Sequence, residues 1–170
     1  MRRKMTLLVF FSAAMVVVAV PYAGHVWATT ASGFKSKTLY MGTFGNIDVF
    51  NKQIQPKGSV WLSLQKTEGA SDLYLQQNDW QGQGSTGWHT HPGHSLIMVT
   101  EGTVTEYEGN DPDCKPHVYT QGMTFVDPGG THVHIIRNES NDPAQTIAVQ
   151  LIPAGAARRI DVADPGNCPF

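Results

Sequence analysis

Histidines spaced for metal binding occur at two places in the chain. His89 and His91 lie in the stretch GWHTHPGHS, and His132 and His134 lie in the stretch THVHIIRN. Successive side chains of a β-strand point to opposite faces, so each i, i+2 pair would present both imidazoles on one face. Neutral imidazoles bind divalent first-row metals, and three of them leave positions open for water or substrate. The two pairs therefore predict a metal site held by two strands.

Short apolar segments must position these histidines. Segments with β-branched and aromatic residues follow one another at regular spacing, separated by Gly, Pro, Asn or Asp, which is typical of an all-β sandwich or barrel. No helical period of apolar residues is sustained between residues 33 and 153, although a short helix over residues 154–160 is compatible with the sequence. The predicted strands are TLYMGTF, SVWLSLQ, DLYLQQND, SLIMVTEG, TVTEYEG, HVYTQG, MTFVDPGG, HVHIIRN and TIAVQLIPAG.

The first residues have the pattern of an export signal. A basic start, MRRK, precedes an apolar run over residues 5–20 that is short for a membrane-spanning helix, and the stretch VWA ending at Ala28 resembles a cleavage site. We therefore predict a signal peptide over residues 1–28 and a secreted or periplasmic protein, without stable membrane association after cleavage. An uncleaved N-terminal membrane anchor is the alternative.

The rest of the chain is interpreted as one domain. Residues 29–37 are small and polar and are expected to form a flexible lead-in, followed by the barrel over residues 38–160 and a C-terminal tail over residues 161–170. The chain has two cysteines, Cys114 and Cys168. An even pair in an exported protein predicts a disulfide, which would tie the tail to the barrel.

The charge balance argues against nucleic acid as a partner. The chain has 12 Lys and Arg against 14 Asp and Glu, and the signal peptide removes part of the basic set. The remaining sequence has no basic patch to contact phosphates. It also lacks a nucleophile elbow, a phosphate-binding loop and a Ser-His-Asp order, so a metal would have to carry most of any chemistry.

The first histidine pair resembles the first motif of the cupin superfamily, in which Gly, His-x-His, Glu and Gly follow one another at set spacings. His89, His91 and Gly102 match this motif, whereas Ser95 stands where the motif has its glutamate ligand. The opening glycine is displaced by one residue, because Gln83 occupies the expected place between two glycines.

The second histidine pair resembles the second cupin motif. The residues that match it are Gly122, Pro128, Gly130 and Asn138. Counting back from Asn138 places the motif's histidine at His134, although the forward count from Gly130 falls between His132 and His134. The resemblance extends over about residues 71–153. It implies a double-stranded β-helix, or jelly-roll, barrel with a metal inside, and it favours a homodimer.

The resemblance implies His89, His91 and His134 as the metal ligands, with His132 as the alternative third ligand or a fourth. Without the glutamate, the expected site is all-nitrogen, which favours zinc, copper, nickel or iron(II) over manganese. His94 follows a Pro-Gly turn and is interpreted as an exposed loop residue.

Residues near the motifs have both a structural and a chemical interpretation. Trp88 is predicted to pack in the core. Glu106 and Tyr107 are interpreted as ordinary strand residues, with proton transfer beside the metal as the alternative. Asp127, before Pro128, is interpreted as a turn residue rather than a base.

The resemblance is more specific for fold than for function, because cupins include dioxygenases, isomerases, decarboxylases, lyases and proteins that only bind ligands. The sequence predicts a secreted metal-binding cupin, and three functions are compatible with it. The first is an oxygenase-type or lyase-type enzyme acting on a small organic molecule. The second is a protein that binds a small ligand without turnover, and the third is a protein whose histidines close a structural metal site.

Overall fold

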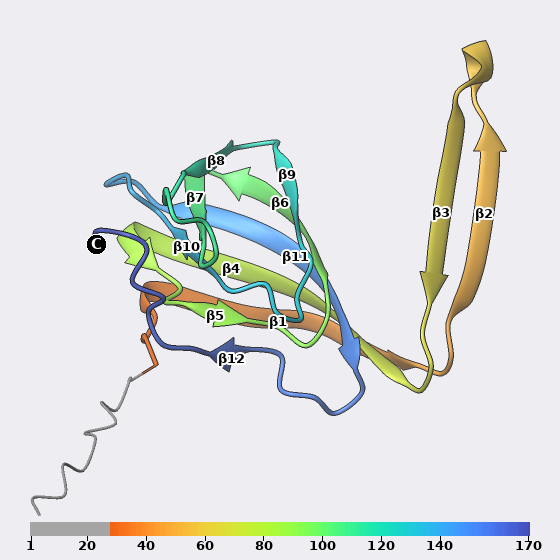
Figure 1. Cartoon of the computed structure of the whole chain (residues 1–170), viewed down its shortest axis with the longest axis horizontal. Coiled ribbons are helices and arrows are strands. Elements are labelled where there is room, and N and C mark those ends of the chain that lie inside the picture. Colours follow the sequence, from red (N-terminus) through yellow and green to blue (C-terminus); the bar gives the residue numbers. More distant parts are fainter. Residues whose placement is uncertain (1–27) are drawn as a thin grey trace, which may run out of the picture.

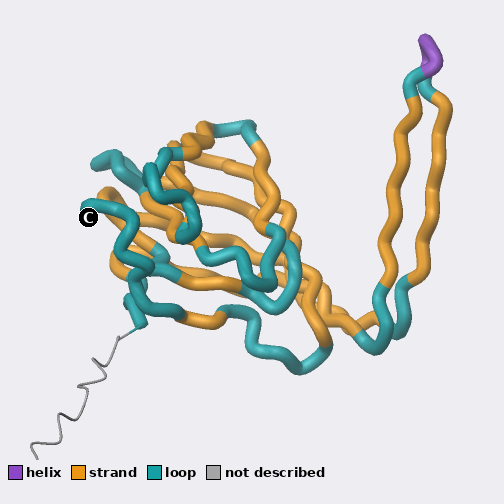
Figure 2. The backbone as a smooth tube through the Cα atoms, viewed as in Figure 1, coloured by secondary structure: helices purple, strands orange, loops and turns teal. Residues whose placement is uncertain are grey.

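The computed structural model describes residues 28–170, and its main body is an antiparallel β-barrel (Figures 1 and 2). The barrel strands are β1 (Ser32–Phe44), β4 (Ser71–Ser85), β5 (His89–Thr90), β6 (Ser95–Glu101), β7 (Thr103–Glu108), β8 (His117–Thr120), β9 (Thr124–Asp127), β10 (His134–Arg137), β11 (Ala144–Pro153) and β12 (Ile160–Asp161). Hydrogen bonds place them in the order β12-β5-β10-β4-β11-β6-β9, with β1 beside β4 and β7 between β10 and β8. The predicted all-β jelly-roll barrel is confirmed.

Alternating burial along the strands builds the core. In β6, Ser95, Ile97 and Val99 point inward and are buried, whereas Leu96 and Met98 point outward. This period of two is the pattern of a strand with one buried face. The main core cluster consists of Trp80, Ile97, Val99, Val104, Phe125, Ile136, Ala144 and Ala148. These side chains come from six strands, so they hold both sides of the barrel together.

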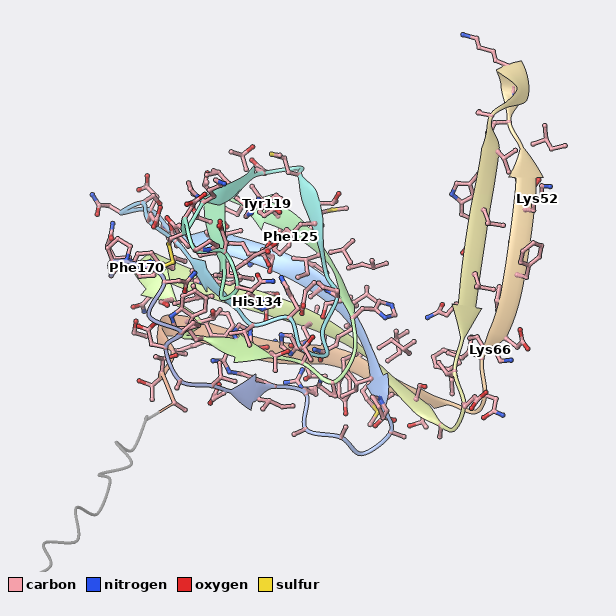
Figure 3. The ribbon with its side chains drawn as sticks, viewed as in Figure 1. Lys52, Lys66, Tyr119, Phe125, His134 and Phe170 are labelled. Atoms are coloured by element: carbon pink, nitrogen blue, oxygen red, sulfur yellow. A yellow bond between two sulfur atoms is a disulfide. The ribbon has the colours of Figure 1, made fainter. Side chains whose placement is uncertain are left out.

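A second core cluster holds the C-terminal tail. Trp88, Tyr107 and Ile135 are buried in it, and Cys114 and Cys168 pack against them. The two cysteines form the disulfide that the sequence predicts, drawn in yellow in Figure 3. The burial of Trp88, which is only 1% exposed, confirms its predicted role in packing.

The expectation of a flexible lead-in over residues 29–37 is wrong for most of that segment. β1 begins at Ser32 and pairs with β4 along its length, with two register shifts. Backbone hydrogen bonds to a long neighbouring strand outweigh the small, polar composition of the segment. Even Thr29 is held, because its N–H donates to the carbonyl of Val162.

The short helix that the sequence would allow over residues 154–160 does not form. The segment is a turn that leads into β12, and Gly155 has a φ of 76°, in the left-handed region that does not continue a right-handed helix. β12 then pairs with β5, the strand of the first histidine motif. The segment therefore returns the chain to the site rather than packing as a helix.

The predicted signal peptide, residues 1–28, lies outside the described residues except for Ala28. Ala28 forms an isolated bridge with Ala163 in the C-terminal tail. Within residues 28–170, no helix is long and apolar enough to cross a membrane.

A β-hairpin projects from the barrel between β1 and β4 (Figure 1). Its strands are β2 (Asp48–Ile54) and β3 (Val60–Lys66), and a 3-10 turn over Pro56–Gly58 joins them. The sequence predicts β3 but not β2, because the apolar residues of DVFNKQI follow no regular period. Both strands are exposed along most of their length.

Candidate metal centre

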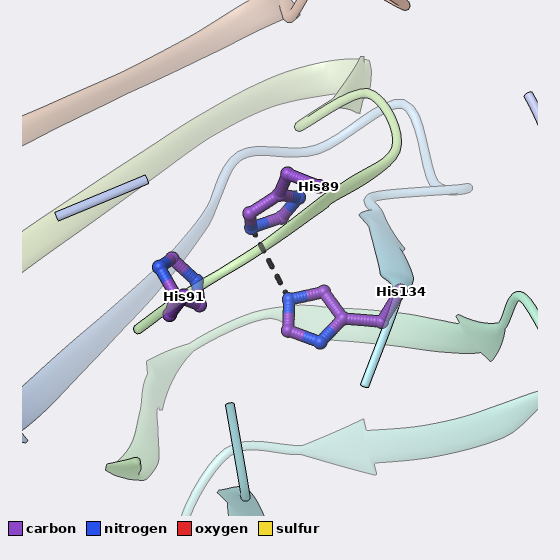
Figure 4. A group of neighbouring side chains, drawn as sticks. All are labelled: His89, His91 and His134. Atoms are coloured by element: carbon purple, nitrogen blue, oxygen red, sulfur yellow. Dashed lines mark hydrogen bonds between the residues drawn. The ribbon is translucent and has the colours of Figure 1, made fainter. Parts of the chain in front are cut away.

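Three of the predicted histidines meet inside the barrel. His89 begins β5 and His91 directly follows this strand, while His134 begins β10 and stands opposite His89 in the β5–β10 pairing. One nitrogen from each ring lies within 4.8 Å of the others. Figure 4 shows the rings around a common centre, with Nε2 of His89 3.2 Å from Nε2 of His134. Two nitrogens bonded to one metal at about 2.0–2.1 Å lie ~3 Å apart, so the spacing fits a shared ion.

Backbone carbonyls orient two of the three rings. Nδ1 of His89 lies 2.9 Å from the carbonyl oxygen of Gly87, and Nδ1 of His91 lies 2.5 Å from that of Arg158. A carbonyl oxygen only accepts, so Nδ1 of each ring carries the proton and donates it. The lone pair of each ring is then on Nε2, and metal-bound histidines are commonly oriented by such a bond from their outer nitrogen.

Burial keeps His89 and His134 neutral. The two residues are 4% and 1% exposed, and the loss of hydration lowers the pKa of both imidazoles well below the usual value. Nearby cationic groups act in the same direction, with Arg159 the largest for His89. Neutral imidazole is the form that binds a metal, so the site is ready for one at neutral pH.

His132 lies on the other side of the His134 ring. The Nδ1 atoms of His132 and His134 are 3.3 Å apart, whereas His89 faces Nε2 of His134. Glu106, His132 and His134 form a second group whose ligand atoms lie within 4.8 Å of one another. Between the two histidines that the sequence left open, the structure therefore brings His134 to His89 and His91.

Glu106 is a buried carboxyl group in this second group. It is 4% exposed, and its Oε1 lies 3.7 Å from Nδ1 of His134. Burial raises the pKa of Glu106 to about 7, with the charge of His132 opposing the rise and that of Asp127 adding to it. Tyr119 donates its hydroxyl to Oε2 at 3.4 Å. Glu106 thus contacts the far side of His134, behind the three converging histidines.

A second buried carboxylate, Asp127, reaches the histidines from the end of β9. It is 0% exposed, and its Oδ2 lies 3.4 Å from Nε2 of His91. Its Oδ1 accepts the N–H of Gly129 at 2.9 Å and lies 3.4 Å from Nδ1 of His132. Burial opposes its ionisation, but these partners together lower the pKa of Asp127. The bond to Gly129 fits the turn that the sequence predicts, whereas the contacts with histidines were not predicted.

A cavity of about 100 Å³ opens beside the three histidines. At roughly 30 Å³ for a water molecule, this volume suits an organic molecule of only a few heavy atoms. Its polar wall includes Gln76 and Gln150, whose amides are hydrogen-bonded to each other at 3.2 Å. Arg158 also lines the cavity, and its Nη1 is buried without a hydrogen-bond partner. A guanidinium nitrogen in that state is suited to an anionic oxygen.

Two residues weighed from the sequence lie away from this cavity. His94 lines a separate surface depression, and its carbonyl accepts the N–H of Leu151. Tyr107 belongs to the second core cluster and donates its hydroxyl to Glu139 at 2.8 Å. Burial, together with the bond to Glu139, raises the pKa of Tyr107 to about 12. Tyr107 is therefore a packing residue that stays protonated.

Comparisons with known proteins give a family and several partial structural likenesses. Residues 77–150 match the family model described as the cupin domain. A comparison with curated proteins finds no significant match.

Three similar solved structures illustrate how far the likeness extends. An oxalate oxidase is 22% identical, with 48% of this chain and 46% of that chain covered and a TM-score of 0.41. Peruvianin-I, described as a cysteine peptidase from Thevetia peruviana latex, is 28% identical over 54% and 56% of the two chains, with a TM-score of 0.43. A predicted oxalate decarboxylase from Thermotoga maritima is 16% identical over 50% and 83%, with a TM-score of 0.40. The matched part spans less than half of the oxalate oxidase chain.

The family match covers both histidine motifs and most of the strands that carry the converging side chains, from within β4 to within β11. Through this part of its barrel, residues 77–150, the chain belongs to the cupin superfamily.

Proposed function

We propose that this protein is an exported, metal-dependent cupin enzyme that acts on a small organic molecule with a negatively charged group. His89, His91 and His134 are its metal ligands. The observation that carries the proposal is the convergence of these three imidazoles, two of them oriented by backbone carbonyls. The donor set fits zinc, copper, nickel or iron, all of which accept imidazole nitrogen.

The cavity beside the histidines determines which molecules fit. Its small volume limits the substrate to a few heavy atoms, and Arg158 supplies an unpaired donor for an anionic oxygen. Gln76 and Gln150 hold each other and offer further polar atoms to the substrate. When bound, the metal would polarise an oxygen of the substrate as a Lewis acid. The protein's own residues therefore bind and orient the substrate beside the ion.

A non-catalytic binding protein is the second candidate. Glu106, whose pKa of about 7 suits proton transfer, is not among the residues that line the cavity. The carboxyl group that does line the cavity, Asp127, has a lowered pKa and is a weak base. A cavity that offers amides and guanidinium groups but no group with a pKa near neutral pH of the Glu106 kind favours capture of an anion over its conversion. Product formation from small organic acids by the metal-loaded protein separates the two candidates.

Export is supported by the disulfide, because such bonds persist in oxidising compartments. The proposed signal peptide over residues 1–28 gives a direct check, since N-terminal sequencing of the exported protein should begin near Thr29. A protein that retains its first residues and stays with the membrane would support the uncleaved anchor instead.

Elemental analysis of the protein, purified without chelator or affinity nickel, tests the metal site. The wild type should hold about one equivalent of a transition metal, and His89→Ala and His134→Ala should lose it. His132→Ala is the matched control, because its ring lies on the other side of His134 and should leave the metal in place. A wild type that takes up no metal, or a loss confined to His132→Ala, would contradict the proposed ligand set.

A further inference from the structure

Strand register places a carboxylate where the first cupin motif lacks one. Ser95 on β6 stands directly opposite Asp127 on β9. Residues directly opposite each other in an antiparallel pair project to the same face of the sheet. Both residues are buried, at 3% and 0% exposure, and both line the cavity at the histidines. β9 thus brings a carboxylate to the place beside the serine.

The two oxygens of Asp127 have different surroundings. Oδ1 accepts the N–H of Gly129 and lies 3.4 Å from Nδ1 of His132 and 3.6 Å from Nδ1 of His134. Oδ2 is buried and has no hydrogen-bond partner, yet it lies 3.4 Å from Nε2 of His91. Buried carboxylate oxygens without a partner are rare and need an explanation, and a cation is the simplest one. One oxygen therefore fixes the side chain, and the other points toward the histidine centre.

We propose that Oδ2 of Asp127 is a fourth protein ligand of the metal, in place of the glutamate that the motif would carry at Ser95. This inference rests on the proposed function, because it needs an ion at His89, His91 and His134. The ligand set becomes three nitrogens and one carboxylate oxygen, which lowers the net charge of the site and makes it more accepting of manganese. On this proposal the site is not all-nitrogen, as the sequence alone predicts.

Glu106 is the competing carboxylate, and its geometry is different. Its Oε1 also lacks a hydrogen-bond partner and lies 3.7 Å from Nδ1 of His134, the nitrogen that Oδ1 of Asp127 also approaches, at 3.6 Å. Asp127 differs because its second oxygen lies beside Nε2 of His91, whereas the histidine contact of Glu106 is with the nitrogen of His134 that faces away from His89. A metal bound to Nε2 of that ring is on the opposite side. Glu106→Gln is therefore a matched control for Asp127→Asn.

The test is the affinity of metal-free protein for Mn²⁺ and Co²⁺, added alone. Asp127→Asn keeps an acceptor for the N–H of Gly129 but removes the charge, and should weaken Mn²⁺ binding about 10- to 100-fold and Co²⁺ binding less. Glu106→Gln should stay within about threefold of the wild type. Adding Ser95→Glu to Asp127→Asn should restore most of the Mn²⁺ affinity, because it returns a carboxylate from the paired position.

The outcomes separate this inference from the proposed function. A wild type that binds neither ion contradicts both. If the wild type binds metal and Asp127→Asn has the same affinity and the same Co²⁺ absorption, Asp127 is not a ligand but the proposed function stands. The same conclusion follows if Glu106→Gln loses as much metal affinity as Asp127→Asn does. If Asp127→Asn does not fold, infrared difference spectra of Glu106→Gln decide: a carboxylate band that still shifts on metal loading supports Asp127, and a band that no longer shifts overturns it.

A second inference concerns the projecting hairpin, and it has an independent basis. Strand register puts Phe50, Ile54, Val60, Leu62 and Leu64 on one face of the ribbon. Each of these side chains is at least 57% exposed. Lys52, directly opposite Leu62, and Lys66, at the base of the hairpin in Figure 3, project to this same face, so the apolar side chains are flanked by two cations. An isolated two-stranded hairpin is marginally stable in water, so we expect this apolar face to pack against another protein surface.

The outer face of the barrel has a matching apolar surface. Leu96 and Met98 on β6, Val126 on β9 and Val149 on β11 point outward and are 36–58% exposed. They line a groove of about 570 Å³. The same chain therefore carries an apolar ribbon and an apolar groove, and neither is covered within residues 28–170.

We infer that the hairpin of one copy lies in this groove of a second copy, and that the exchange is reciprocal. At about 100 Å² for each exposed apolar side chain of the ribbon, and somewhat less for those of the groove, two such contacts bury roughly 1,600 Å². That area is the size of a standard stable interface. A twofold dimer uses each surface twice and leaves neither exposed.

Light scattering after size-exclusion chromatography at micromolar concentration tests this dimer. The wild type should be a dimer, and Leu64→Asp on the ribbon and Met98→Asp on the groove should each be monomeric with unchanged circular dichroism. Ser63→Asp, which alters the opposite face of the hairpin, is the control and should remain dimeric. A monomeric wild type overturns the inference. So does the combination of a monomeric Leu64→Asp variant and a dimeric Met98→Asp variant, because the ribbon would then pack against a surface other than the groove.

Discussion

His134 stands opposite His89 across β10 and β5, and their Nε2 atoms are 3.2 Å apart. The two residues are 45 positions apart in the chain and belong to different histidine motifs. Strand pairing alone brings them together, and His91 lies two residues beyond His89, directly after the same strand. The proposed metal centre is therefore a product of barrel closure rather than of any local loop.

Metal removal should leave the barrel folded. The two core clusters contain none of the three histidines, so packing does not depend on an ion. Loading at 100 times the dissociation constant should add about 2.7 kcal/mol to the free energy of unfolding, because the ion binds only the folded state. Calorimetry with and without chelator measures this difference, and His89→Ala should abolish it. A metal-free wild type that is unfolded would instead identify a structural site.

Arg158→Gln should weaken the binding of a small carboxylate such as formate to the metal-loaded protein. Loss of a charged hydrogen bond from the unpaired Nη1 should cost about tenfold in affinity or more, with the metal content unchanged. The backbone carbonyl that accepts from His91 is retained in this variant. Titration followed by the Co²⁺ spectrum provides the measurement.

Arg159→Gln is the control for that variant. The guanidinium of Arg159 is already engaged with Asp161 and with the carbonyl of Thr86, so it has less to offer an added anion. Equal losses in both variants would mean that general positive charge, rather than the donor of Arg158, attracts the carboxylate.

The sequence predicts the barrel and the histidines better than it predicts the surroundings of the site. Alternating burial in β6 and the spacing of His89 and His91 are local patterns, and both can be read directly from neighbouring residues. The contact of Asp127 with His91 depends on the register between β6 and β9, which no local pattern encodes. The strand character of residues 32–37 likewise comes from pairing with β4 and not from composition.

Removal of the disulfide should lower stability without removing the metal. Cys114 and Cys168 are 54 residues apart, and a cross-link of that span stabilises by about 4 kcal/mol in the chain-entropy model. The bond lies in the second core cluster, which contains none of the three converging histidines. Urea unfolding of the Cys114→Ser, Cys168→Ser double variant gives the change in free energy. Unaltered stability would show that the tail is held by its packing alone.

Asp72 should make stability fall in acid. Its carboxylate accepts the hydroxyl of Thr43 at 2.6 Å and the N–H of Gly155 at 2.9 Å, and these bonds lower its pKa in the folded protein. A depressed pKa stabilises the fold at pH values above the unfolded pKa of about 3.9. That contribution declines below this pH and is lost as pH falls through the lower pKa of the folded state. Asp72→Asn should therefore be less stable at neutral pH, with a shallower decline between about pH 5 and pH 3. Parallel unfolding curves for the two proteins across this range would assign the acid sensitivity to other groups.

Anomalous X-ray diffraction from crystals of the metal-loaded protein, recorded at the absorption edge of the bound metal, tests the proposed centre most directly. The predicted result is a single peak about 2.0–2.2 Å from Nε2 of His89, His91 and His134. A peak between Glu106, His132 and Nδ1 of His134, or no peak inside the barrel, would contradict the proposed centre.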